Sequence, residues 1–241
     1  MSTTEHGALD GRSVLVTGAS RGIGRCIAER FAAAGARVFG LGRSEDALRR
    51  LADETGGRAL VVDLTDDVAV WDAMDRLSDE LEGAPDVVVN AAGVFGITPI
   101  AEETVAALDL ELALNLRAPV LVVRTLLPSM LERGSGLIVN VGSVAGRKAL
   151  PGNGAYSASK FGLRGFHEVL LEEVRGTGVR ATLLEPSATD TSIWDPLDPD
   201  ADPSLPPRSA MLRPEDVADA ALFVARCPRD VRIPLLQIEH A

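Results

Sequence analysis

Short runs rich in β-branched residues alternate with longer helical patterns from one end of the chain to the other. Most of these runs are continuously apolar, as strands are when helices cover both of their faces. This order predicts an α/β fold with a doubly wound, mostly parallel sheet of about seven strands and helices on both faces. The expected strands are residues 13–16, 37–41, 59–62, 86–89, 137–141, 179–184 and 233–238, and the expected helices follow Gly24 and lie near 45–55, 67–82, 102–132, 154–175 and 214–226.

The length of 241 residues suits one domain and does not require a second. We expect residues 1–12 to form a flexible N-terminus and residues 13–241 to form the single domain. One segment departs from the alternation, because residues 194–208 hold five of the 14 prolines and four aspartates. This composition predicts that the segment forms no regular element.

Charge and cysteine content exclude several classes of protein. The net charge of −11 repels polyanions, so nucleic acid and anionic membrane are not expected partners. Cys26 and Cys227 are the two cysteines and form no CxxC pair, which fits a reducing cytoplasm and argues against a disulfide framework. No apolar run is long enough to suggest export or a membrane span, and no clustered ligands predict a metal site.

A glycine-rich loop follows the first expected strand and precedes a helix. The loop contains Gly18, Gly22 and Gly24. Glycines let backbone N–H groups approach a pyrophosphate, and the helix N-terminus adds partial positive charge beneath it. The motif therefore predicts a dinucleotide-binding site, although a tight turn without a ligand is the alternative reading of the glycines alone.

Two further segments are expected at the same edge of the sheet. The sequence Asn90-Ala91-Ala92-Gly93 follows the fourth strand, where small residues allow a ligand to approach the backbone. Asp63 follows the third strand and can accept a hydrogen bond from an adenine amino group. Turn formation explains Asp63 equally well, because Asp, Asn and Gly are frequent in turns.

Tyr156 is the only tyrosine, and Lys160 is one of only two lysines. Four residues apart on a helix, the two side chains share a face. A nearby ammonium group favours the phenolate and is expected to lower the pKa of Tyr156, which makes it usable for proton transfer. Ser143 ends the fifth strand, where its hydroxyl can hold a substrate oxygen or bond to its own backbone.

Taken together, these motifs resemble those of the short-chain dehydrogenase/reductase family, from Ser13 to about Ile238. The resemblance implies a Rossmann-like domain and a catalytic set of Asn115, Ser143, Tyr156 and Lys160, with Asn115 bending a long helix and holding a water. It departs at Ser187, where the family usually has glycine. The cofactor contacts that we predict are Gly18, Ser20, Arg21, Gly22, Ile23, Gly24, Arg43, Asp63, Leu64, Asn90, Ala91, Ala92, Gly93, Tyr156, Lys160, Pro186, Thr189 and Thr191.

The function predicted from these residues is hydride transfer between a nicotinamide and a carbonyl or secondary alcohol substrate, with Tyr156 as general acid/base. The alternative is a dinucleotide-binding regulator or redox sensor without turnover, because fold alone does not imply catalysis. The family resemblance implies a homodimer or homotetramer through the helices at 102–132 and 154–175. His167 is interpreted as an ordinary, partly exposed histidine.

NADP(H) is predicted over NAD(H). Gly42 stands where an NAD-selective enzyme needs a carboxylate for the ribose 2′-hydroxyl, and Arg43 follows it directly. Arg21 is a second cation available to the 2′-phosphate. Residues 192–212 are expected to form a mobile, substrate-covering loop. The predicted substrate pocket suits an apolar or aromatic carbonyl compound and consists of Val94, Phe95, Leu150, Trp194, Leu197 and Met211.

Overall fold

The computed structural model describes residues 9–241 and contains one seven-stranded sheet. All strands are parallel, in the order β3-β2-β1-β4-β5-β6-β7, so the predicted fold class is confirmed and the sheet is fully rather than mostly parallel. The strands are β1 (Ser13–Thr17), β2 (Arg37–Gly42), β3 (Arg58–Val61), β4 (Val87–Asn90), β5 (Gly136–Val141), β6 (Val179–Pro186) and β7 (Leu235–Ile238).

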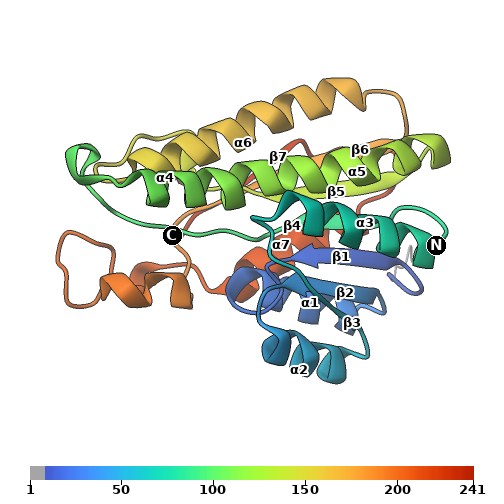
Figure 1. Cartoon of the computed structure of the whole chain (residues 1–241), viewed down its shortest axis with the longest axis horizontal. Coiled ribbons are helices and arrows are strands. Elements are labelled where there is room, and N and C mark those ends of the chain that lie inside the picture. Colours follow the sequence, from blue (N-terminus) through green and yellow to red (C-terminus); the bar gives the residue numbers. More distant parts are fainter. Residues whose placement is uncertain (1–8) are drawn as a thin grey trace.

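Helices cover both faces of this sheet, with α3, α5 and α6 on one side and α1, α2 and α7 on the other (Figure 1). Each face has its own buried apolar cluster, as continuously apolar strands require. The helices are α1 (Gly22–Ala33), α2 (Glu45–Thr55), α3 (Asp67–Leu81), α4 (Val105–Leu112), α5 (Ala118–Arg133), α6 (Gly154–Glu173) and α7 (Pro214–Arg226).

The strand order reverses between β1 and β4. From β1 the chain adds β2 and β3 on one side, whereas β4 to β7 continue on the other. Thr17 at the end of β1 is in register with Asn90 at the end of β4. Loops that leave these two ends diverge, which creates the crevice in which doubly wound sheets bind their ligands.

The helix expected at 102–132 is divided. A 3-10 turn η1 (Ile100–Glu102) precedes α4, and a π-helical turn η2 (Ala113–Arg117) joins α4 to α5. Asn115 lies in this π turn and is fully buried. Its position agrees with the irregularity expected there, since π turns occur frequently at functional sites.

Two segments were expected to be irregular, residues 1–12 and 194–208, and the structure differs from this expectation in part of each. Residues 1–8 of the expected flexible N-terminus lie outside the described residues, whereas Leu9 is fully buried and its N–H donates to the Ala34 carbonyl oxygen. Leu9 therefore packs against the domain that was expected to begin at Ser13. In the segment at 194–208, local composition predicted no regular element, and this is wrong for two short stretches, the 3-10 turns η4 (Ser192–Leu197) and η5 (Arg208–Ala210).

Local hydrogen bonds hold η4 in place despite its proline. Thr191 Oγ1 accepts from the Ile193 N–H at the first turn, and the buried Trp194 donates from Nε1 to the Thr189 carbonyl oxygen at 3.1 Å. Among residues 9–241, no helix is long and apolar enough to cross a membrane.

Candidate active site

A cavity of about 660 Å³ opens at the carboxyl edge of the sheet, beside the switch between β1 and β4. The glycine loop, the loop after β4, the start of α6 and the segment after β6 all contribute to its wall. The predicted site residues that line it are Gly18, Ser20, Arg21, Gly22, Ile23, Gly24, Arg43, Leu64, Ala91, Ala92, Gly93, Val94, Phe95, Ser143, Leu150, Tyr156, Lys160, Pro186, Thr189, Thr191 and Trp194.

Two glycines of the loop after β1 are required by close backbone contacts. A Cβ at Gly18, where φ is +71°, would lie 2.7 Å from Ala92 Cα. A Cβ at Gly24 would lie 2.4 Å from the Gly18 carbonyl oxygen. The glycines therefore bring the loop against the segment after β4 and the start of α1 against the loop, leaving backbone N–H groups at the cavity wall.

Thr17 joins the two loops, a role that the sequence did not reveal. Its Oγ1 accepts from the N–H groups of Ala91 and Ala92 at 3.1 and 3.2 Å. Because Thr17 ends β1 and these alanines follow β4, one hydroxyl fixes the spacing of the two cavity walls. A polar side chain at the end of a strand, before a glycine loop, is the only signal for this role in the sequence.

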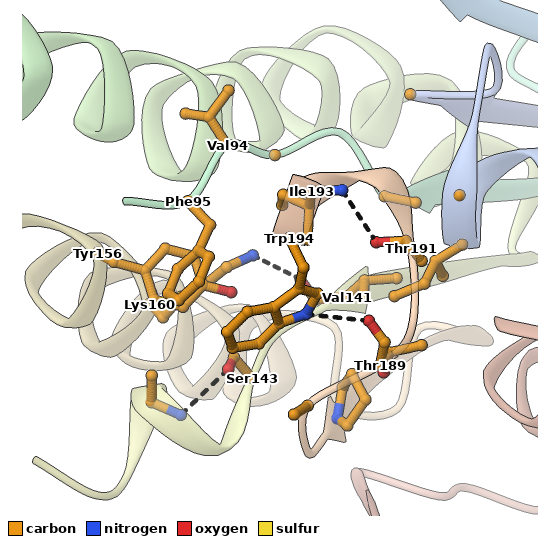
Figure 2. Close-up of a pocket in the computed structure, with 18 of the residues that line it drawn as sticks. Val94, Phe95, Val141, Ser143, Tyr156, Lys160, Thr189, Thr191, Ile193 and Trp194 are labelled. Carbon is orange, nitrogen blue, oxygen red and sulfur yellow. Dashed lines mark hydrogen bonds between the residues drawn. The ribbon is translucent and has the colours of Figure 1, made fainter. Parts of the chain in front are cut away.

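Ser143, Tyr156 and Lys160 meet at the inner end of the cavity (Figure 2). Ser143 follows β5, and its Oγ accepts from the Ala145 N–H at 3.1 Å. Lys160 Nζ donates to the Val141 carbonyl oxygen at 3.0 Å and lies 5.7 Å from the centre of the Tyr156 ring. The bond of Ser143 to its own backbone is therefore present, and its hold on a substrate oxygen stays a prediction.

The pKa values of this pair differ from the expectation for Tyr156. Burial raises the pKa of Tyr156 to about 12, although the Ser143 hydrogen bond lowers it. Burial also lowers the pKa of Lys160 to about 8. The expected lowering of the tyrosine pKa is wrong for this state because desolvation of the phenolate outweighs the attraction of the ammonium group. Tyr156 is therefore a protonated donor at neutral pH.

Asn115 holds the loop after β4 from behind the cavity. Its Oδ1 accepts from the Val94 N–H at 2.8 Å, and its Nδ2 donates to the Val94 carbonyl oxygen and to Ser159 Oγ. Ser159 Oγ in turn donates to the Tyr156 carbonyl oxygen at 2.7 Å. Asn115 thus connects the cavity wall to the helix that carries Tyr156 and Lys160.

Aromatic rings cover the tyrosine. Phe95 lies between Tyr156 and Trp194, with ring centres 4.8 Å from each and edge-to-face angles (Figure 2). Such pairs are worth about 0.5–1.5 kcal/mol beyond burial. The substrate end of the cavity is therefore walled by aromatic and aliphatic side chains close to the Tyr156 hydroxyl.

Leu197 and Met211 do not line the cavity. A 3-10 helix rises ~2 Å per residue, so η4 carries Leu197 roughly 6 Å beyond Trp194. Met211 is buried elsewhere, because its neighbour Leu212 forms a β-bridge with Thr189. Leu205 and Pro206 line the cavity in their place, and no periodic pattern in the sequence indicates them.

Three other predicted residues lie off the cavity wall. The Asp63 carboxylate accepts from the Thr65 N–H and hydroxyl at 2.9 and 2.8 Å, the turn chemistry considered as its alternative. Asn90 is buried in the sheet and donates to Asn140 Oδ1 at 2.9 Å. His167 is 1% exposed rather than partly exposed, and burial lowers its pKa.

His167 is buried because it belongs to a polar chain through the core. Asn140 Nδ2 donates to its Nδ1 at 3.2 Å, and its Nε2 donates to the Pro234 carbonyl oxygen at 3.1 Å. Sequence position alone did not reveal these partners, which come from β5 and the segment before β7.

The cation at the other end of the cavity is Arg43. It lines the cavity beside Gly42, and its guanidinium lies 3.9 Å from Asp63 Oδ2. A Cβ at Gly42 would meet only ordinary contacts, the nearest being Ser20 Oγ at 3.6 Å. Arg21 instead reaches Ser192 Oγ at 3.5 Å, so the two arginines do not share a partner.

The fit of a dinucleotide rests on these features. Close backbone contacts forbid side chains at Gly18 and Gly24, the cavity is elongated from Arg43 to Tyr156, and Lys160 stands beside the tyrosine. With the switch point of a doubly wound sheet, they define a dinucleotide-dependent oxidoreductase.

Comparisons with known proteins agree with this class of protein. The family described as short chain dehydrogenase matches residues 12–202, and the chain belongs to this family of NAD(P)-dependent oxidoreductases. A D-threitol dehydrogenase of Mycolicibacterium smegmatis is 37% identical over 226 residues, which cover 90% of this chain and 86% of that protein.

Solved structures show the same fold. The closed form of a serine dehydrogenase complexed with NADP⁺ is 32% identical with a TM-score of 0.86, and the match covers 94% of each chain. A metagenomic short-chain oxidoreductase in complex with NADP is 31% identical with a TM-score of 0.83, covering 98% of this chain and 99% of that one.

Proposed function

We propose that this protein is an NADP(H)-dependent carbonyl reductase or alcohol dehydrogenase in which Tyr156 transfers the proton. The observation that carries the proposal is the meeting of Ser143, Tyr156 and Lys160 at the wall of a glycine-lined cavity, with Lys160 Nζ 5.7 Å from the centre of the tyrosine ring. A pure binding module has no need for a phenol, a hydroxyl and an ammonium group gathered in this way.

Each side chain has a separate task in this mechanism. When bound, the nicotinamide supplies hydride to a carbonyl carbon or accepts it from an alcohol. Ser143 holds the substrate oxygen, and Tyr156 donates its proton to that oxygen as negative charge develops. Lys160 stabilises the tyrosinate that remains, and its pKa of about 8 lets it supply a proton near neutral pH.

The residues that would hold the cofactor are distributed along its length. Backbone groups at Gly18 to Gly24 would bind the pyrophosphate, and Lys160 with Thr189 and Thr191 would bind the nicotinamide end. Gly42 and Arg43 support selection of NADP(H), because a cation without a competing carboxylate favours a 2′-phosphate. The NADP complexes of the two structural relatives are consistent with this selection.

The substrate that suits this cavity is a neutral, apolar or aromatic carbonyl compound. Phe95, Trp194, Leu150 and Leu205 line its substrate end, and among the described lining residues the only charged groups are Arg21, Arg43 and Lys160. The relatives are named for D-threitol and serine, which are polar. The apolar wall supports a different preference for this chain, because a polar substrate would lose hydration there without new partners.

Spectrophotometry tests this proposal, as NADPH consumption with aldehydes, ketones, quinones and 3-oxo acids and as NADP⁺ reduction with polyols. We expect turnover with apolar carbonyls, and Tyr156→Phe is expected to lower kcat by roughly 10²- to 10⁴-fold with NADPH binding retained. Phe161→Tyr, at an exposed position of α6 outside the cavity, is the matched control. Tight NADPH binding without turnover on the whole panel would favour a regulator or redox sensor.

A further inference from the structure

Glu111 is a buried acid that the proposed mechanism does not use. It lies on α4, one helical turn before Asn115, and only 6% of its surface is exposed. One carboxylate oxygen accepts a hydrogen bond from the Gly96 backbone, whereas Oε2 has no partner among residues 9–241. A buried carboxylate normally has partners for both oxygens, so the position of Glu111 calls for a role.

Glu111 is electrostatically linked to the catalytic pair. Its charge raises the pKa of both Tyr156 and Lys160, and within the described chain no other charged group perturbs both. The groups that act on Glu111 are Lys160 from α6, Glu103 from the segment after η1, and the Gly96 N–H. Burial, with a smaller contribution from Glu103, raises the pKa of Glu111 to about 7, where a carboxyl group exchanges protons readily.

The loop after β4 passes both the catalytic lysine and Glu111. A Cβ at Gly93 would lie 3.1 Å from Asn115 Oδ1 and 3.9 Å from Lys160 Nζ, so Asn115 and Lys160 both lie beside this glycine. A Cβ at Gly96 would lie 3.4 Å from the bonded oxygen of Glu111. The loop after β4 thus has glycine at both points where it passes these polar groups.

A second unpartnered atom lies on α6, next to the catalytic tyrosine in the sequence. Ser157 Oγ, adjacent to Tyr156 on α6, is buried and has no partner in the described part of the chain. Helices α4 and α6 pack against each other. Buried polar atoms without protein partners are normally bonded by water, and water is the usual carrier of protons between side chains.

We propose that Glu111 is a relay residue, which takes up a proton from solution and passes it between the packed helices α4 and α6 to Lys160. This inference rests on the proposed function of Tyr156. In each reduction Tyr156 gives its proton to the substrate oxygen, Lys160 reprotonates the tyrosinate, the Glu111 carboxylic acid reprotonates Lys160, and one solvent proton restores Glu111. The residue acts through Lys160 and does not touch the substrate.

The decisive experiment is the pH profile of kcat for carbonyl reduction in the wild type and in Glu111→Gln. We expect the wild-type kcat to fall as pH rises through about 7, because the carboxylate has no proton to give. In Glu111→Gln, kcat should drop at least about tenfold, the inflection of Glu111 should vanish so that only the inflection of Lys160 shapes the profile, and the solvent deuterium isotope effect on kcat should rise.

If Glu111→Gln folds poorly, two further variants still test the relay. Glu111→Asp should retain the inflection. Glu103→Gln should retain turnover and move the inflection to lower pH, because the Glu103 charge raises the pKa of Glu111. Infrared titration of the cofactor-free protein gives an independent readout, since the band of a protonated carboxyl group should persist to about pH 7 in the wild type and be lost in Glu111→Gln.

The outcomes separate this inference from the proposed function. An active wild type with an inactive Tyr156→Phe, combined with an unchanged profile in Glu111→Gln, overturns the relay alone. A lower kcat with the inflection and isotope effect unchanged indicates a structural role and also overturns it. A wild type that binds NADPH but reduces no carbonyl overturns the proposed function and the relay with it.

Discussion

Arg43 is the residue on which cofactor selection depends, and its surroundings leave it available. The neighbouring Asp63 lies 3.9 Å away, but both side chains are solvent-exposed, with Arg43 at 64%. Exposed ion pairs contribute only about 0–1 kcal/mol, so Asp63 competes weakly with a phosphate. A charge-assisted hydrogen bond to a 2′-phosphate is worth about 1.5–3 kcal/mol, which exceeds the pair it replaces.

We therefore expect Gly42→Asp combined with Arg43→Leu to change the ratio of catalytic efficiencies with NADPH and NADH by at least about tenfold toward NADH. The carboxylate would accept hydrogen bonds from a ribose 2′-hydroxyl and repel a phosphate, and Gly42 has room for a Cβ. Steady-state kinetics with both cofactors measure the change. Arg49→Leu, which removes an exposed cation paired with Glu45, is the control; equal wild-type use of both cofactors would contradict the assignment.

Residue type and spacing were enough to predict which groups meet at the site, but not their protonation. The single tyrosine and the lysine four residues later predicted a shared helix face, which α6 confirms. The direction of the Tyr156 pKa was wrong because it depends on burial, which comes from segments far away in the sequence. Glu111 was missed for the same reason, since an acid among apolar neighbours on a helix carries no sign of its distance from Lys160.

At the scale of elements, the segment from Ser192 to Ala210 is held closed by one arginine. Arg208 contacts Asp190 at 2.5 Å, Asp195 at 2.7 Å and Asp200 at 3.9 Å. These three aspartates thus surround a cation. These ion pairs, which we call the Arg208 clasp, join η5 to η4 and to the segment after β6. They must break before the expected opening of residues 192–212.

Arg208→Gln should loosen this segment, because three carboxylates would then face one another without a cation. We expect faster hydrogen exchange in residues 192–210 and a several-fold higher KM for the carbonyl substrate, with the Kd for NADPH little changed. Hydrogen exchange followed by mass spectrometry checks the first effect. Arg213→Gln is the control, because Arg213 pairs only with Asp216 at the start of α7; equal exchange in both variants would argue against the clasp.

The positions of strands were predictable where a run of consecutive residues carries the pattern. Six of the seven strands lie within one residue of the expected start, because buried parallel strands read as continuous apolar runs. The turns η4 and η5 were not predictable from composition, since Trp194 packs on Phe95 and Arg208 pairs with Asp190, partners that lie far away in the sequence. The division of the helix at 102–132 was indicated only by the family resemblance at Asn115.

For the whole molecule, the parallel order of the sheet explains why the segments that follow six of its strands, β1 to β6, reach one cavity. Every strand ends at the same edge, and the reversal between β1 and β4 opens that edge. The meeting of the strand ends at one edge follows from the alternation of strands and helices alone, so it was predictable from the sequence. The paths of the connecting segments beyond the edge were not, and this is why Leu197 and Met211 were expected at a cavity that Leu205 and Pro206 line.

The last prediction concerns assembly. On α6, Phe161 and Val169 are 47% and 57% exposed, and between them Gly165 has open space beside it. Spaced four residues apart, these positions form one stripe on the outer face of the helix. On the neighbouring α4, Val105 and Leu110 are also exposed. Large apolar side chains gathered on adjacent helices are typical of an interface, so we expect a homodimer or homotetramer through this face.

Phe161→Glu should therefore yield a smaller species than the wild type in sedimentation velocity at micromolar concentration. The new carboxylate would be buried without a partner and would add to the negative charge of Glu168 on the same helix, which disfavours association. Val68→Glu, at an exposed apolar position on α3, is the matched control and should keep the wild-type mass. Unchanged thermal unfolding of the separated subunits would show that α6 remains folded. A monomeric wild type, or a Phe161→Glu variant of wild-type mass, would place the contact elsewhere or remove it.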